Sequence, residues 1–361
     1  MKKLEKQDIV DILYGCALLG TGGGGNLQKG IDMMEDDFAA GRPLYLADLS
    51  EIPDDEYVAT PYGCGAPSAS GEKLPELSEA PAVTAFRSLE KFVGKRFAAV
   101  SSTELGGENT AEALRVACQL GLPIADSDPA GRSVPELIHS TFYICGKPID
   151  PFAVATNYGD VAVFEKVRND ERAEAMVRAI ATASGNEVSV CDHPMCGAEF
   201  RESVIPGAIS NALKIGKLLR EAKEKGTDAA SAVAETMSGK VLFRGKVTDI
   251  PWESRDGFDF GSIFIEGNSE FTGHKYRIDF KNENIASYLD GQLDVTMPDL
   301  ICMIDGGGDP LTNPDFEPGT EINVIALPAP EMWTSERGLE LFGPRHFGID
   351  ADYIPFNKKR K

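Results

Sequence analysis

The stretch from residue 97 to residue 125 constrains the fold most, because its pattern predicts a strand, a helix and a second strand with short loops between them. Residues 97–101 and 122–125 are apolar runs of strand length, and residues 110–120 have helical spacing with Gly121 as a stop signal. Such a unit forms a parallel, right-handed crossover. Residues 56–60 predict one more strand, followed by a loop at 61–67. The N-terminal part is therefore predicted to be an α/β domain with a largely parallel sheet.

The loops that leave these strands carry polar side chains. Residues 102–109 follow one strand and include Glu104 and Asn109, whereas residues 126–132 follow the next and include Asp126, Asp128 and Arg132. In a parallel sheet the loops after the strands open on one edge, and ligands bind there. We therefore expect these five residues to share one neighbourhood, which is the predicted working site.

The rest of the chain predicts a second domain of different composition. Helical spacing covers residues 4–19, 171–184 and 206–237, and strand-like stretches follow at 240–248, 261–267, 275–280, 285–288 and 322–327. A charged, polar stretch near residues 165–170 separates the halves. The predicted division is an N-terminal α/β domain at 1–168 and a C-terminal α+β domain rich in β-strands at 169–361.

Charge and cysteine content narrow the classes of partner. The 361 residues include 36 Lys or Arg and 57 Asp or Glu, for a net charge of −21. Nucleic acid and anionic membrane surfaces need a basic face, so neither is expected as a partner. No run approaches the roughly 20 apolar residues of a membrane span, and no apolar signal segment opens the chain. Seven scattered cysteines do not indicate a disulfide framework. We expect a cytoplasmic homo-oligomer that binds a small molecule.

A glycine run at residues 20–25 interrupts the chain after the first predicted helix. A glycine-rich loop binds phosphate when it leads into a helix N-terminus. Here the run follows a helix C-terminus, and no Gly-Lys-Ser/Thr sequence comes after it. A nucleotide loop is therefore disfavoured. A loop in which Gly22, Gly23, Gly24 and Gly25 cover a substrate, or a tight packing turn, remains open.

The carboxylates beside the predicted sheet edge have two interpretations. Asp126 and Asp128 are one residue apart, so an extended segment would place them on one side, with Glu104 from the neighbouring loop nearby. Close carboxylates share a proton or hold a cation. Alternatively, Asp128 caps the next turn and Asp126 bonds backbone amides. Arg132 either clamps a substrate carboxylate or pairs with Asp126 or Glu136.

Two further motifs carry polar residues. Cys191, His193 and Cys196 are possible zinc ligands, but no second ligand pair follows at the usual spacing, so semi-buried thiols and a surface histidine are favoured. Asn282, Glu283 and Asn284 either contact a ligand or form a hairpin turn. None of the four histidines has a triad-like context, and no Gly-x-Ser-x-Gly elbow is present.

Taken in order, these motifs resemble one known family. The motifs are Gly20–Gly25, Gly65-Ala-Pro67 with Glu72-Lys73, Glu104–Asn109, Gly121–Asp128, Gly131-Arg132 with Pro135-Glu-Leu137, Asn282–Asn284, Pro298–Ile301 and Gly343–Gly348. The ordered set resembles the S-methyl thiohydantoin desulfurase family over nearly the whole chain. The resemblance implies an α/β N-terminal domain and a β-rich C-terminal domain. A departure is Asn26, where the family pattern leads us to expect an acidic residue.

The resemblance also implies a chemistry. The named family member is a hydrolase that removes methanethiol from a thiohydantoin ring and is thought to need a divalent transition metal. We therefore expect a metal-assisted hydrolase of a hydantoin-like or thiohydantoin-like cyclic amide, with cobalt, zinc or manganese. Glu104, Asp126 and Asp128 would hold the metal and its water, and Glu283 would act as a base or anchor from the second domain. Gly22–Gly25, Asn109, Arg132 and Asn284 would bind the substrate.

An alternative function does not require catalysis. No residue in the sequence is an unmistakable nucleophile, and relatives often accompany hydantoinase and oxoprolinase-type proteins. The chain could then be a non-catalytic ligand-binding or accessory subunit of such an enzyme.

Overall fold

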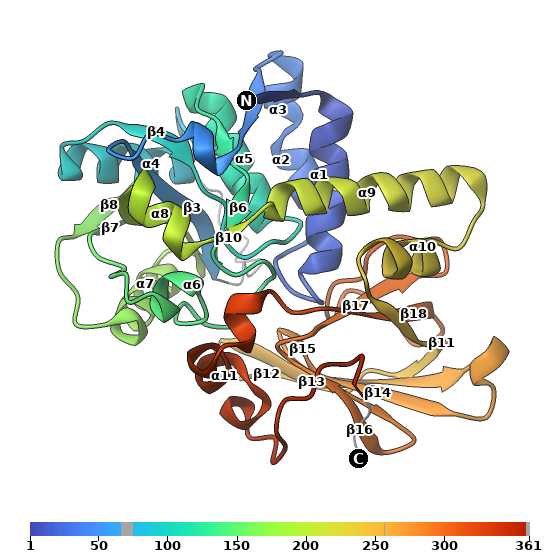
Figure 1. Ribbon diagram of the computed structural model, residues 1–361. Helices are drawn as coiled ribbons and strands as arrows, with labels where there is room; N and C mark the ends of the chain where they lie inside the picture. Colours follow the sequence, from blue (N-terminus) through green and yellow to red (C-terminus); the bar gives the residue numbers. More distant parts are fainter. Residues whose placement is uncertain (66–74, 256, 359–361) are drawn as a thin grey trace.

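The computed structural model describes residues 1–65, 75–255 and 257–358, and it contains two large sheets, one above the other in Figure 1. The motif residues Ala66, Pro67, Glu72 and Lys73 lie outside these ranges. Within them, no helix is long and apolar enough to cross a membrane.

The first sheet has eight strands in the order β1-β2-β5-β4-β3-β9-β7-β8. The strands are β1 Lys2–Leu4, β2 Leu44–Ala47, β3 Tyr57–Gly65, β4 Phe97–Val100, β5 Ile124–Ala125, β7 Phe152–Thr156, β8 Val161–Phe164 and β9 Glu187–Cys196. The pairs β2–β5, β5–β4 and β4–β3 are parallel, and the other pairs are antiparallel. The α/β class is confirmed, but the sheet is mixed rather than largely parallel. The predicted loop at 61–67 is also corrected, because β3 continues to Gly65 in pairing with β9.

Helices cover the first sheet, and the predicted helices at 4–19, 110–120 and 171–184 are among them. They are α1 Lys6–Leu19, α2 Leu27–Met33, α3 Glu35–Ala39, α4 Pro81–Val93, α5 Asn109–Leu120, α6 Thr141–Ile144, α7 Asp170–Ala183 and α8 Gly197–Ser203, with the 3-10 helix η1 Leu49–Glu51. Helix α4 begins with Pro81 in its first turn, and α5 ends at Gly121, whose φ of 66° is left-handed. The predicted strand–helix–strand unit at 97–125 is therefore present as β4, α5 and β5.

The second sheet is antiparallel and strongly curved. Its strands are β11 Lys240–Asp249, β12 Trp252–Arg255, β13 Phe258–Gly267, β14 Lys275–Lys281, β15 Glu283–Leu289, β16 Gln292–Thr296, β17 Leu300–Asp305 and β18 Glu321–Leu327. A separate two-stranded pair joins β6 Ser127–Asp128 to β10 Ile205–Pro206. The C-terminal segment adds η2 Ser269–Phe271, η3 Glu331–Thr334, α11 Glu336–Phe342 and η4 Pro344–Phe347. Alternating buried residues such as Tyr276, Ile278 and Phe280 fill the sheet interior, as predicted for a β-rich C-terminal half.

Two long elements connect the sheets. Helix α9 Ala208–Lys225 packs along α1, and α10 Ala229–Thr236 lies against β11 and β18. Gly15 and Gly216 permit the close approach of α1 and α9, since a Cβ on Gly15 would stand 1.9 Å from the carbonyl oxygen of Ala212. One large apolar core includes side chains from α1, α9 and the second sheet. The two halves are therefore packed as one body.

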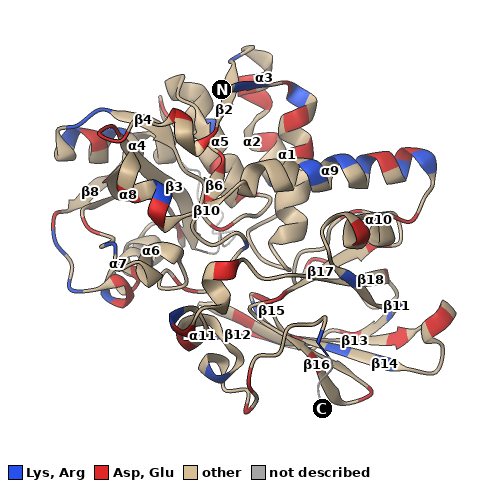
Figure 2. Ribbon diagram, viewed as in Figure 1, with Lys and Arg blue, Asp and Glu red and all other residues tan. Residues whose placement is uncertain are grey.

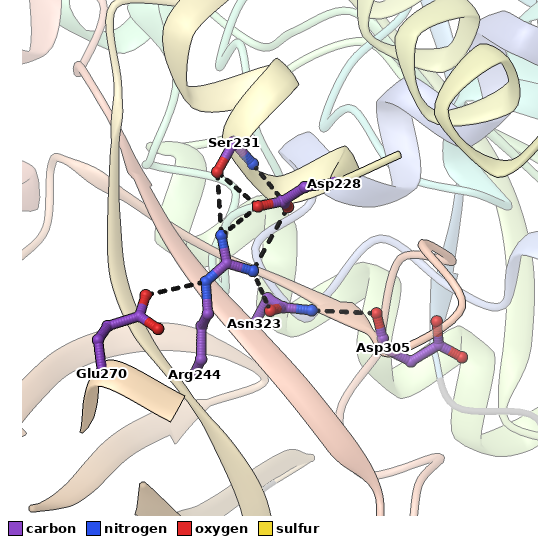
Figure 3. A network of polar contacts seen from close by, with 6 residues as sticks. All are labelled: Asp228, Ser231, Arg244, Glu270, Asp305 and Asn323. Carbon is purple, nitrogen blue, oxygen red and sulfur yellow. Dashed lines mark hydrogen bonds and ion pairs between the residues drawn. The ribbon is translucent and has the colours of Figure 1, made fainter. Parts of the chain in front are cut away.

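A polar network fixes α10 to the second sheet (Figure 3). Arg244 on β11 donates to Asn323 Oδ1 at 2.8 Å and to Ser231 Oγ at 3.0 Å. It also pairs with Asp228, the N-cap of α10, and with Glu270 at 3.3 Å. Elsewhere the acidic residues are spread over both halves rather than gathered in one patch (Figure 2).

Candidate functional site

Arg132 lies at the junction of the two halves and is fully buried. Its guanidinium donates to the carbonyl oxygen of Pro298 at 2.9 Å and to Thr21 Oγ1 at 2.8 Å. It also stands over the Phe342 ring, 5.1 Å from the centroid. Burial lowers the pKa of Arg132 to about 10, so the side chain stays charged at neutral pH. In this structure Arg132 holds segments together, and it pairs with neither Asp126 nor Glu136 as the sequence had suggested.

The glycine run packs against the second half of the chain. The carbonyl oxygen of Thr21 accepts from the Asn284 amide at 2.8 Å, and that of Gly22 accepts from the Asn313 amide at 2.8 Å. A Cβ on Gly23 would stand 1.9 Å from Glu283 Oε1. Only glycine fits there without displacing the carboxylate. The sequence leaves open a loop that covers a substrate or a tight packing turn, and the geometry supports the packing turn.

Glu283 and Asn284 follow the predicted hairpin turn, which lies at Asn282 between β14 and β15. Both side chains are buried. Ser133 Oγ donates to Glu283 Oε1 at 2.8 Å, whereas Glu283 Oε2 has no hydrogen-bond partner in the described part of the chain. Burial raises the pKa of Glu283 to about 7. Near neutral pH this carboxyl group therefore binds or releases a proton readily.

Asp126 and Asp128 make separate contacts. Asp126 accepts from the Ser210 amide at 2.8 Å and from Ser210 Oγ at 2.5 Å, which caps the first turn of α9. Asp128 is buried and accepts from Ser102 Oγ and from the amides of Ala130 and Gly131 at 2.7–2.8 Å. Burial raises the pKa of Asp128 to about 6 despite these hydrogen bonds. Both aspartates therefore make the structural contacts, capping and hydrogen bonds to backbone amides, that were the alternative to a cation site.

Glu104 lies between these groups in an unusual backbone conformation, with a φ of 55°. Burial and then the carboxylates of Glu283, Asp128 and Glu174 raise its pKa well above 4.5. The raised pKa favours the protonated form of Glu104 over its carboxylate. Asn109 begins α5, and its amide donates to Gly24 at 3.3 Å.

The predicted metal ligands do not form a cluster. Among the residues that the structure describes, no group of three His, Cys, Asp or Glu side chains is placed to hold a metal ion. The oxygens of Asp126 and Asp128 already accept hydrogen bonds from Ser210, Ser102 and backbone amides. The three carboxylates therefore do not fit a metal in this arrangement, and the metal itself stays a prediction.

A small cavity lies next to Glu104. Its volume is about 20 Å³, which is room for one water molecule. The lining side chains are Tyr62, Thr103, Glu104, Val134, Leu137, His139, Ser140, Phe142, Asp192 and His193. Most of them come from β3, β9 and the loops after β4 and β6, so the cavity lies at the predicted sheet edge.

His193 and Asp192 form a buried pair at this cavity. Nδ1 of His193 is 2.9 Å from Asp192 Oδ1, and Tyr62 donates to Asp192 Oδ2 at 2.8 Å. The Phe142 ring stacks on the imidazole with centroids 4.5 Å apart. Nε2 of His193 is buried and has no hydrogen-bond partner among the described residues. The pair therefore presents an oriented imidazole nitrogen with its hydrogen-bonding capacity unused.

The sequence interpretation of His193 was wrong. The side chain is 4% exposed, not on the surface. Its φ of 45° marks a β-bulge in β9, where the register with β3 shifts. Bulges re-aim side chains. Cys191 is buried in the core and Cys196 contacts Glu199, so neither thiol joins the histidine. The signal in the sequence was the Asp-His dipeptide.

Comparison with known proteins agrees with the resemblance of the motifs. Residues 7–166 match the family model described as S-Me-THD-like, N-terminal domain, and residues 168–356 match S-Me-THD-like, C-terminal domain. The fold is similar to the crystal structure of a protein from Chromobacterium violaceum. That similarity has a TM-score of 0.80 at 24% identity, over 99% of this chain and 100% of the other. The search of curated proteins found no match.

Proposed function

The chain belongs to the S-Me-THD-like family, and from this we propose that it hydrolyses a thiohydantoin-like ring at the cavity beside Glu104. The substrate class is a five-membered cyclic amide that carries an S-methyl group on a ring carbon. The observation that supports this proposal most is the buried Asp192–His193 pair, whose free nitrogen lies on the same cavity as Glu104.

His193 is the proposed general base. Asp192 accepts from Nδ1, which places the lone pair on Nε2, and Tyr62 holds the other oxygen of Asp192. An imidazole with this orientation removes a proton from water when water attacks an electrophilic carbon. A cavity with room for one water is the place for that nucleophile.

Glu104 is the proposed general acid. Burial and the neighbouring carboxylates raise its pKa, which favours the protonated form that can donate to a leaving group. Two groups on one cavity, one a base and one an acid with a raised pKa, are the arrangement that hydrolysis requires.

The proposed steps conserve atoms and protons. Water loses one proton to His193 Nε2, and its oxygen bonds to the ring carbon. The bond from that carbon to sulfur breaks, and sulfur takes the proton of Glu104 and leaves as methanethiol. The second water proton moves to ring nitrogen as the carbonyl forms. The proton on His193 then returns to Glu104, which resets the site.

The cavity is too small for the ring itself. About 20 Å³ accommodates a water molecule but not a five-membered ring with substituents. The ring therefore enters only when the cavity widens, and substrate binding should change the environment of Tyr62 and Phe142 on its wall.

The test is methanethiol release from an S-methyl thiohydantoin by the purified chain. A thiol reagent follows the product, and His193→Gln and Glu104→Gln should each lower kcat by at least about 100-fold. His274→Gln is the matched control, since His274 is exposed and pairs only with Asp290 in a surface hairpin. Full activity of the His193→Gln and Glu104→Gln variants would contradict the assignment.

Metal content is measured on the same untagged protein before any chelator is added. The family resemblance predicts about one cobalt, zinc or manganese ion per chain. Loss of that metal in Glu104→Gln and Asp126→Asn would support the ligands predicted from the sequence. Metal retained in both variants would place it elsewhere. No turnover by the isolated chain, with recovery of a hydantoinase-type enzyme in stoichiometric amount, would favour the accessory subunit.

A further inference from the structure

A second histidine lines the cavity and contacts a third histidine outside it. His139 is fully buried and is part of the same cavity wall as His193 and Glu104. Its Nε2 is 3.2 Å from Nε2 of His346, and the two rings are nearly perpendicular, at 84°. Because both contacting atoms are imidazole nitrogens at hydrogen-bond distance, one donates and the other accepts.

His346 reaches the outside of the protein. The residue is exposed and lines an open groove of about 540 Å³ on the second half of the chain. Glu136 and Lys281, which are paired with each other, lie on the same groove. The two histidines therefore connect the small cavity beside Glu104 with the open groove.

Apolar rings surround this contact. Phe342 and Phe347 lie 5.0 and 5.5 Å from the His139 ring, centroid to centroid. Nδ1 of His139 is buried and makes no hydrogen bond within the described ranges. A water in the cavity is a suitable partner for a nitrogen on this wall.

The electrostatics favour neutral rings. Burial, and then His346, Lys281 and Arg132, lower the pKa of His139 well below 6.5, while the Leu341 carbonyl opposes this. Burial and Lys281 lower the pKa of His346, with Glu136 and the Glu340 carbonyl opposing. Two neutral imidazoles pass a proton by exchanging tautomers. The inner ring gains a proton at Nδ1 as it loses one from Nε2. The outer ring takes that proton at Nε2 as it releases one from Nδ1 to solvent, so no charge accumulates.

We propose that His139 and His346 form a proton relay between the cavity beside Glu104 and the surface groove, and that this relay equilibrates His193 and Glu104 with solvent between turnovers. The roles of His193 and Glu104 rest on the proposed function. The path through His139 and His346 rests on the contact geometry and is testable without a substrate.

The first experiment measures solvent exchange of imidazole N–H protons by NMR on the intact chain labelled with ¹⁵N-histidine. In His346→Gln, exchange at His139 and His193 should slow at least tenfold. His274→Gln should change neither rate. Because His346 is exposed, its variant should keep the fold, which circular dichroism checks. Unchanged exchange at both buried histidines in a folded His346→Gln protein would overturn the relay, whether or not the chain has any activity.

The second experiment uses turnover. In weakly buffered solution His346→Gln should release methanethiol at least tenfold more slowly than the natural chain, and added imidazole should restore the rate. A structural defect would not be rescued by a proton carrier. If exchange is slowed in His346→Gln but the natural chain releases no methanethiol, the relay is upheld and the proposed function is refuted. Slowed exchange with unimpaired turnover would overturn the relay's part in catalysis.

Discussion

Replacement of Glu283 by Gln tests the electrostatics of the junction between the two halves. Burial raises the pKa of Glu283 from 4.5 to about 7, so the folded chain holds a proton there that the unfolded chain releases above pH 4.5. Stability from this group is therefore present at low pH and is lost as pH rises from about 4.5 to 7. A difference of one in pKa corresponds to about 1.4 kcal/mol. At pH 8 the ionised Glu283 therefore lowers the free energy of unfolding of the natural chain by at most about 3 kcal/mol.

Glutamine mimics the protonated acid at every pH. Glu283→Gln should therefore match the natural chain at about pH 4 and exceed its free energy of unfolding by 1 to about 3 kcal/mol at pH 8. Urea unfolding at the two pH values measures this, and the exposed Glu317→Gln is the matched control. Because Glu283 also raises the pKa of Glu104, the difference between the two proteins reports Glu283 together with its coupling to Glu104. A Glu283→Gln protein that is less stable than the natural chain at pH 8 would refute the reasoning.

Three smaller changes test other contacts. Gly23→Ala places a Cβ against Glu283 and should lower the free energy of unfolding by about 1–3 kcal/mol; an unchanged urea midpoint would show that the turn adapts. Asp126→Asn should cost about 1 kcal/mol at most through the α9 cap and keep methanethiol release, whereas a metal ligand at this position predicts complete loss. Arg244→Met removes the partly exposed network that fixes α10 and should cost about 1 kcal/mol; a loss below 0.3 kcal/mol in urea unfolding, on the order of error, would make the network dispensable.

Local signals were enough to predict the central unit of the first sheet. The stop at Gly121 and the apolar runs on either side of α5 depend only on neighbouring residues. The placement of β9 could not be predicted in this way. It pairs antiparallel with β3 and β7, and such long-range pairing leaves no short-range pattern.

The site was predicted in its neighbourhood but not in its details. Glu104 lies on the cavity at the sheet edge as the topology suggested. Asp126 and Asp128 were expected on one side because residues two apart in a strand share a face. The chain instead leaves β5 at Asp126 and enters β6 after it, so the two carboxylates contact different partners. His193 was missed because a bulge breaks the alternation that would have revealed its burial.

The position of β9 bears on how this protein could be divided. The two family models meet between residues 166 and 168, yet β9 at Glu187–Cys196 lies between β3 and β7 inside the first sheet. A gene cut at that junction would yield an N-terminal fragment with a gap in the middle of its sheet. The C-terminal fragment would carry a strand with both edges unpaired. Neither fragment is then a self-sufficient module, and a pair of them produced together would regain order by strand complementation, which makes residue 167 a candidate split point for a reassembly reporter.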